Sequence, residues 1–248
     1  IVFGDWSSDV CSSDLPAGHG VKFRRTDKED QPVIPASIDY VVDTSRGTTI
    51  GINGTRVFTI EHVMASLTGL GIDNVLIDVD VDEMPIRDGS ARYFVEALEE
   101  AGIEEQDMAR EYLEITEEIV LKNDEKGFEM RIVPAPHFMV DVKIDYNTEV
   151  LNVQYASLHQ LSDFKKEIAP CRTFVFLHEL EFLLKNNLVK GGDLSNAIVF
   201  VNRAMSQEEL DRLATLFNKP KVKVKEEGIL NNLELHFPNE PARHKLLD

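Results

Sequence analysis

The spacing of apolar and polar residues predicts short strands separated by tight turns over the first eighty residues. Residues 75–81 alternate between apolar and polar positions, which is typical of a half-buried strand. Asn53-Gly54 is a strong two-residue hairpin signal, and Arg46-Gly47 marks a second turn. Strands are therefore expected at 20–25, 40–42, 48–50, 56–59 and 75–81.

Two helices are expected in the same part of the chain. Thr59 can cap the first of them. Its apolar stripe has helical spacing and comprises Val63, Met64, Leu67 and Leu70, with Gly69 and Gly71 ending it. The sequence Asp88-Gly89-Ser90 opens the second helix, whose inner face comprises Phe94, Val95 and Leu98.

The remainder of the chain predicts a second unit rich in strands. Strands are expected at 113–121, 128–133, 138–146, 171–176 and 197–201, with an exposed basic strand at 219–225. Helices are expected at 162–168, at 178–187 and from Glu240 to the last residue. This antiparallel-looking mixture indicates an α+β fold and not a regular alternation around a parallel sheet. The acidic stretch 104–107 is interpreted as a linker between a first domain, 16–108, and a second, 109–248.

Residues 1–15 do not fit this pattern. The stretch from Asp5 to Leu15 resembles translated sequencing-adapter read-through, so we interpret 1–15 as a non-native segment. A genuine flexible arm is the alternative. On the first interpretation, Trp6 and Cys11 have no functional role.

Composition and charge exclude some classes of protein. With 43% hydrophobic and 28% charged residues, the chain is typical of a soluble globular protein. A formal net charge of -18 argues against non-specific nucleic-acid binding, which needs a basic surface. No apolar run is long enough to cross a bilayer. Two cysteines, Cys11 and Cys171, and no evident signal peptide predict a reducing, cytoplasmic location.

Candidate chemistry lies in two distant segments. His244 and Asp248 are four residues apart, so on a helix they share a face and can bind one zinc ion. A catalytic zinc site typically has three protein ligands, and His62 is the candidate for the third. Taken alone, such spacing is more often an exposed or salt-bridged pair, and a single histidine is more often an ordinary core or surface residue.

Three further residues have a chemical and a structural interpretation. Glu61 beside His62 can accept a proton from water at a zinc site, or it can simply favour the first turn of a helix. Lys245 and Thr173 can stabilise developing negative charge. The alternatives are a solvated lysine and an ordinary strand threonine.

Several ordered motifs resemble one enzyme family from residue 16 to residue 248. They are Ile60-Glu61-His62, 69–74, 84–91, Cys171-Arg172-Thr173-Phe174, Gly191-Gly192, 196–199 and 243–248. Together they are similar to the UDP-3-O-acyl-N-acetylglucosamine deacetylases, zinc enzymes of bacterial lipid A synthesis. The resemblance implies two α+β domains of similar sheet-and-helix architecture, with Zn²⁺ in the cleft between them.

The resemblance also implies the reaction and the roles of residues. The 2-acetamido group of UDP-3-O-(3-hydroxyacyl)-N-acetylglucosamine is hydrolysed and acetate is released. Glu61 matches the general base, and Thr173 and Lys245 match the groups that stabilise the oxyanion. The metal ligands match His62, His244 and Asp248. The substrate-binding regions, which border the site or form the acyl passage, match Arg46, Gly47, Phe174, Leu183 and Gly192.

The chain departs from the family pattern at both ends. The family begins with a strand and a Gly-Leu-His-Thr-Gly-like segment, and here the adapter-like residues stand in its place. The family has a Gly-His motif beyond the second ligand pair that supplies the general acid, so this chain is expected to lack that acid. Some members are fused to a hydroxyacyl-carrier-protein dehydratase. The resemblance therefore allows a fused dehydratase domain in the parent protein. Two other interpretations stay open: a non-catalytic protein that binds a nucleotide-sugar or acyl chain, with a vestigial metal site, and a structural α+β scaffold.

Overall fold

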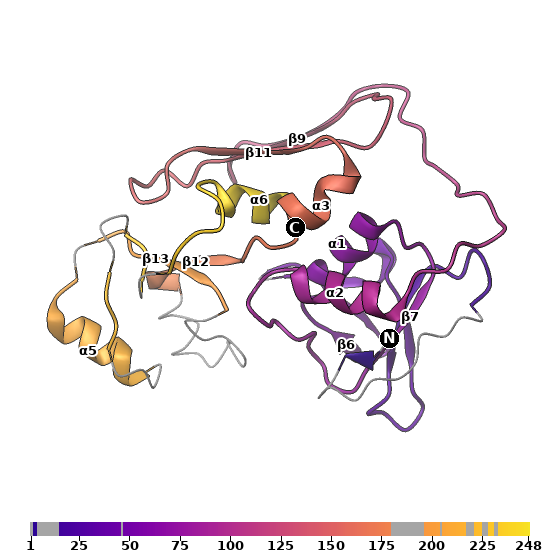
Figure 1. Cartoon of the computed structure of the whole chain (residues 1–248), viewed down its shortest axis with the longest axis horizontal. Helices are drawn as coiled ribbons and strands as arrows, with labels where there is room; N and C mark the ends of the chain where they lie inside the picture. Colours follow the sequence, from indigo (N-terminus) through magenta and orange to yellow (C-terminus); the bar gives the residue numbers. More distant parts are fainter. Residues whose placement is uncertain are drawn as a thin grey trace.

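The structure is a computed structural model of the 248-residue chain. It describes the backbone of residues 2–3 and all atoms of 15–45, 47–179, 196–203, 205–216, 221–224, 228–230 and 233–248. Helices and several small sheets together form the α+β fold that the sequence predicts (Figure 1). In these ranges, no helix combines the length and the apolar character needed to cross a membrane.

The largest sheet has four strands and is mixed. Its order is β1 (Val2–Phe3), β7 (Val75–Val79), β2 (Val21–Arg25) and β3 (Val33–Pro35). Strand β7 pairs parallel with both β1 and β2, while β3 is antiparallel to β2. The alternation in β7 buries Val75, Ile77 and Val79, as expected for a strand with one face on a core.

Two helices supply the rest of this first core. They are α1 (Glu61–Leu70) and α2 (Arg92–Ala101), and they lie beside the sheet in Figure 1. Val63 and Leu67 from α1 pack with Phe94 and Leu98 from α2 on the sheet side chains. Gly71 ends α1 in the left-handed conformation, with φ 69°, which a glycine adopts without steric cost.

A three-stranded antiparallel sheet leads into α1. It comprises β4 (Val41–Asp43), β5 (Thr49–Ile52) and β6 (Thr55–Val57), preceded by the short helix η1 (Ile38–Tyr40). The Asn53-Gly54 turn is confirmed: Ile52 pairs with Thr55, and both turn residues have positive φ, 49° and 83°. The β4–β5 loop, which contains Gly47, reaches the candidate site.

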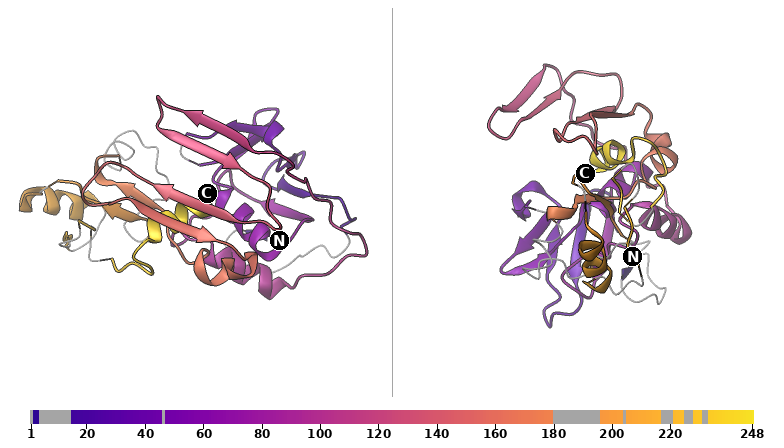
Figure 2. Two further views of the ribbon diagram at one scale, coloured as in Figure 1. Left: turned by 90° about the horizontal axis from the view of Figure 1, so that it is seen from above. Right: turned by 90° about the vertical axis from the view of Figure 1, so that its left-hand side faces the viewer.

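The second half is built from two antiparallel hairpins and one parallel pair. The strands are β8 (Ile119–Asn123) with β9 (Phe128–Ile132), β10 (Val140–Ile144) with β11 (Gln154–Leu158), and β12 (Phe174–Phe176) with β13 (Ile198–Phe200). The β8–β9 hairpin projects from the body of the molecule, and nearly all its residues are exposed (Figure 2).

Four helical segments lie wholly within the part of this half that the structure describes. They are η2 (Leu161–Asp163), α3 (Phe164–Glu167), α5 (Gln207–Leu216) and α6 (Glu240–Leu247). The predicted start of the last helix at Glu240 is confirmed, and Pro241 in its first turn suits a helix N-terminus. Helix α6 packs against β10 and β11 and reaches α1 (Figure 1).

Some expectations about local structure were wrong. Thr59 does not cap α1: its backbone has φ 60° and its hydroxyl donates to Glu83, while the cap residue is Ile60 without a side-chain bond. Strands β2 and β7 pair in parallel, whereas the sequence looked antiparallel. The alternation of apolar and polar residues predicts a strand but not its partner or the direction of pairing. In the predicted basic strand, residues 221–224 contribute only an isolated bridge at Val224, and Val222 is buried.

With one exception, each apolar cluster is formed by residues from only one half of the chain. One cluster lies wholly between Val21 and Leu98, and two others use side chains from residue 142 onward. The exception joins Ala91 and Val95 to Phe164 and Leu247, so the two halves share a packed junction. The boundary at 108 stays our interpretation.

Candidate metal centre

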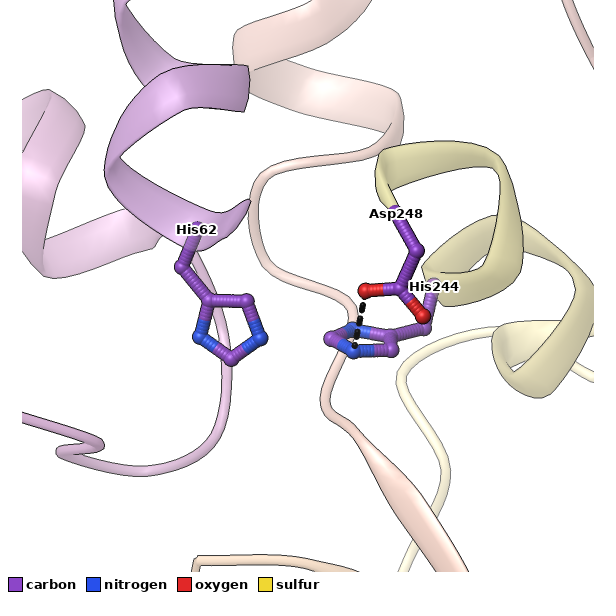
Figure 3. Close-up of side chains that lie close together, drawn as sticks. All are labelled: His62, His244 and Asp248. Atoms are coloured by element: carbon purple, nitrogen blue, oxygen red, sulfur yellow. Dashed lines mark ion pairs between the residues drawn. The ribbon is translucent and has the colours of Figure 1, made fainter. Parts of the chain in front are cut away.

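Three predicted ligands from distant parts of the sequence converge. One ligand atom from each of His62, His244 and Asp248 lies within 4.8 Å of the others (Figure 3). His62 comes from the first turn of α1, whereas His244 and Asp248 are one turn apart at the end of α6. The two imidazole rings are 5.1 Å apart between centroids and nearly perpendicular, at 87°.

The separation of the two α6 ligands suits a small tetrahedral cation. Two ligands bound tetrahedrally to zinc at about 2.1 Å lie about 3.4 Å from each other. Nε2 of His244 is 3.5 Å from Oδ1 of Asp248, the ion pair drawn in Figure 3. Two imidazoles and one carboxylate also form a donor set that zinc commonly uses.

Both imidazoles are held in the neutral form that a metal requires. The exposed fraction of His62 is 3% and that of His244 is 1%. Burial, followed by the neighbouring His244, lowers the pKa of His62 to about 3. Burial likewise lowers the pKa of His244. Neutral nitrogens in a buried position are available as metal ligands.

A backbone carbonyl orients the His244 ring. Nδ1 of His244 lies 2.9 Å from the carbonyl oxygen of Cys171, so the ring nitrogen donates and the carbonyl accepts. This bond fixes the tautomer and leaves the Nε2 lone pair facing Asp248. Ligating histidines in metalloproteins are typically held in this way by their second nitrogen.

Glu61 lies next to the three ligands and is itself restrained. Its Oε2 accepts a 2.9 Å hydrogen bond from the backbone N–H of Thr48. Burial raises the pKa of Glu61; the Thr48 bond opposes this, and the charges of Asp248 and Lys245 act in opposite directions. A carboxylate with a raised pKa beside a metal group suits proton transfer near neutral pH.

Lys245 forms an ion pair with Asp248, one of the three candidate ligands. Its Nζ lies 2.7 Å from Oδ2 of Asp248. Burial lowers the pKa of Lys245, but Asp248, Tyr146 and Glu61 together raise it more, so the net shift is upward and the side chain is a cation. A positive charge is therefore held within one residue of His244.

The other predicted site residues are placed as follows. The backbone N–H of Thr173 donates to the carbonyl of Gly89 over 2.7 Å, which ties the strand segment before β12 to the loop before α2. Phe174 stacks edge-on against Tyr146, with centroids 5.5 Å apart. Gly47 lies against the Glu61 carboxylate. Arg46, Leu183 and Gly192 lie outside the described residues, as does the predicted helix beyond residue 179.

Sequence reasoning missed Tyr146. Its ring packs against Phe174 and Phe176. Burial raises its pKa, and the charges of Lys245, Asp248 and Glu179 also act on it. A single tyrosine just after a strand carries no motif, so only its position in the fold identifies it.

A pocket opens beside the acidic residues of the site. It has a volume of about 340 Å³, and Glu61 and Asp248 are the charged residues of its lining. Most other lining residues are apolar, including Met64, Phe138 and Leu246. Apolar walls around the two carboxylates agree with the upward shift in the pKa of Glu61.

Comparison with known proteins gives the family. The sequence model described as LpxC, UDP-3-O-acyl N-acetylglycosamine deacetylase, matches residues 7–217. The chain belongs to the LpxC family. This confirms the family resemblance seen in the motifs. The match begins at residue 7, inside the segment interpreted as non-native, and the origin of that segment stays a prediction.

Individual relatives give the same family. A "Bifunctional enzyme LpxC/FabZ" from Bacteroides thetaiotaomicron is 44% identical over 96% of this chain and 52% of its own length. One with the same description from Chlorobaculum tepidum is 46% identical over 94% of this chain and 50% of its own length. A "UDP-3-O-acyl-N-acetylglucosamine deacetylase" from Myxococcus xanthus is 40% identical over 94% of this chain and 66% of its own length. The chain thus spans about half the length of the bifunctional LpxC relatives.

Proposed function

We propose that this chain contains the metal centre of a zinc-dependent deacetylase acting on UDP-3-O-(3-hydroxyacyl)-N-acetylglucosamine in lipid A biosynthesis. The observation that carries the proposal is the convergence of His62, His244 and Asp248 within 4.8 Å, with Glu61 beside them. The names of the relatives support the substrate and the reaction. The product is acetate, and the cytoplasm is the predicted location.

The three ligands would hold Zn²⁺ through two imidazole nitrogens and one carboxylate oxygen. When bound, zinc supplies Lewis-acid chemistry: it polarises the acetamido carbonyl and makes water easier to deprotonate. The buried, neutral histidines and the 3.5 Å spacing of the α6 pair support this donor set.

Glu61 is the proposed general base. Its carboxylate accepts the proton of the attacking water, and its raised pKa brings that proton transfer closer to neutral pH. The Thr48 N–H holds one oxygen of the carboxylate and leaves the other, Oε1, free of that bond. General bases of this kind contribute roughly 10²- to 10⁴-fold to the rate.

Lys245 and Thr173 are the proposed groups that stabilise the oxyanion of the tetrahedral intermediate. Lys245 contributes a positive charge one residue from a ligand, and a charge that is already in place where the oxyanion forms stabilises it. Phe174, Leu183 and Gly192 are proposed to border the acyl chain, and Arg46 and Gly47 are proposed to border the site. The relatives named LpxC/FabZ support a second, dehydratase domain in the parent protein.

The test uses the full-length parent protein with Glu61→Gln, and Glu29→Gln at an exposed position as the matched control. Deacetylation of the UDP-sugar substrate and zinc content are measured together. We expect Glu61→Gln to retain zinc and to lose at least about 100-fold in kcat, because only the base is removed. Activity retained in Glu61→Gln would contradict the base assignment. A parent protein that binds the sugar but never releases acetate would indicate the non-catalytic binding protein instead.

A further inference from the structure

A buried ion pair lies behind the metal ligands and is not used by the proposed chemistry. Nε of Arg172 lies 2.8 Å from Oε1 of Glu240, and Nη2 lies 3.1 Å from Oε2. The Glu240 side chain has 0% exposure and that of Arg172 has 10%. Such pairs are expensive to bury, and apolar replacements of the same shape are often as stable. The burial of this pair is therefore weak evidence for a stabilising role, and its other contacts are informative.

The carboxylate of Glu240 also binds backbone groups. It accepts hydrogen bonds from the N–H of Arg172, 3.0 Å from Oε1, and from the N–H of His236, 2.6 Å from Oε2. Glu240 is the first residue of α6, where the helix dipole favours a negative charge. The start of α6 is thereby fastened to the segment between Cys171 and Thr173.

One peptide unit connects this carboxylate to the metal centre. The N–H of Arg172 and the C=O of Cys171 belong to the same peptide group, which is planar and, in this chain, trans. Its N–H donates to Glu240, and its C=O accepts the Nδ1 hydrogen bond of His244 over 2.9 Å. Because the unit is rigid, fixing the direction of the N–H also fixes the direction of the C=O.

Helix α6 contacts this peptide at both ends. Glu240 and His244 are four residues apart and lie on one face of the helix. We propose that Glu240 is a positioning residue for the metal ligand His244, acting through the Cys171–Arg172 peptide. In its absence the carbonyl is free to tilt, and the His244 ring loses its fixed orientation toward the metal. This inference rests on the proposed metal centre.

The test measures metal binding by this chain and not catalysis. Glu240→Gln removes the charge but keeps the shape of the side chain. Its affinity for Zn²⁺ is measured by competition with a chromophoric chelator, and the visible absorption spectrum of the Co²⁺ form reports ligand geometry. We expect affinity to fall by about 10- to 100-fold, as for other groups that orient metal ligands, and the Co²⁺ bands to shift.

The control breaks another arginine–carboxylate pair away from the site, in which the arginine is buried and the side chain of Asp27 is 25% exposed. Arg25 is 3% exposed, and its Nε and Nη2 each lie 2.7 Å from the Asp27 carboxylate. Asp27→Asn is expected to lower Tm and to leave the metal affinity and the Co²⁺ spectrum unchanged. Should Glu240→Gln not fold, Glu240→Asp keeps the charge but shortens the reach to the peptide N–H, and we expect it to shift the Co²⁺ bands and weaken affinity.

The outcomes separate the two proposals. If the wild-type chain binds metal and the folded Glu240 variant binds it equally well with the same Co²⁺ spectrum, the positioning role is overturned and the metal centre stands. If the wild-type chain binds no metal, the proposed metal centre fails, and the positioning role fails with it.

Discussion

The backbone N–H of Thr48 donates a 2.9 Å hydrogen bond to the carboxylate of Glu61, thirteen residues further along the chain. The β4–β5 loop therefore reaches across to the start of α1 and restrains the proposed base. Gly47 precedes the donor, and a Cβ added to it would lie 2.7 Å from Oε1 of Glu61. A side chain at position 47 would therefore push the Glu61 carboxylate from its place.

Gly47→Ala is expected to displace the Glu61 carboxylate without removing a metal ligand. Misplacing a catalytic group by about 1 Å costs up to roughly 100-fold in rate, so we expect kcat of the parent protein to fall by about 10- to 100-fold. We expect the zinc content of Gly47→Ala to equal that of the wild type. Ser45→Ala, in the same loop but exposed, is the control and keeps full activity. An unchanged kcat in Gly47→Ala would show that the loop does not set the position of Glu61.

The metal-free chain is expected to lose stability in mild acid because two neutral histidines are buried. The pKa of His62 is about 3 in the folded chain against an ordinary 6.5, so below pH 6.5 the unfolded chain binds more protons. Each such histidine lowers the free energy of unfolding by up to about 1.4 kcal/mol per pH unit between 6.5 and the folded pKa. Above pH 6.5 this contribution is constant.

Denaturant titrations in a chelator at pH 7.5 and pH 5.5 measure this loss. His62→Asn should show a smaller difference between the two pH values than the wild type. His159→Asn, which removes an exposed histidine paired with Asp141, should behave as the wild type does. Equal differences for the wild type and His62→Asn would mean that His62 is not buried as a neutral ring.

Cys171 is expected to be unreactive in the folded chain. It is fully buried, and burial followed by the charge of Glu240 raises its pKa to about 12. The thiolate is the reactive form, so alkylation by iodoacetamide at pH 8 should be far slower than in the denatured chain. Peptide mapping by mass spectrometry distinguishes Cys171 from Cys11. Equal alkylation rates in native and denatured protein would place Cys171 at the surface.

Local patterns in the sequence predicted the parts of this fold that depend on local energetics. The Asn53-Gly54 turn needs two residues with positive φ, and the sequence supplies two that tolerate it. The His244–Asp248 pair depends only on helical spacing, and α6 has that spacing. The alternation over Val75–Val79 depends only on one buried face.

Features that depend on tertiary contacts were not predictable in this way. The parallel pairing of β2 with β7 is fixed by packing of the whole sheet and not by either strand. Threonine is a residue type that often caps helices. The positive φ of Thr59 and its hydrogen bond to Glu83 prevent it from capping α1. The Cys171 carbonyl that orients His244 is a backbone atom and leaves no trace in residue identity.

The most direct test of the central claim is the zinc content of this chain. The wild type, His62→Ala and the exposed control His159→Ala are stripped of metal, reloaded, passed through gel filtration and measured by elemental analysis. We predict about one zinc per chain in the wild type and the control, and loss of zinc in His62→Ala, because a site of this kind needs all three protein ligands. A wild-type chain without zinc, or a His62→Ala chain with as much zinc as the wild type, would contradict the proposed metal centre.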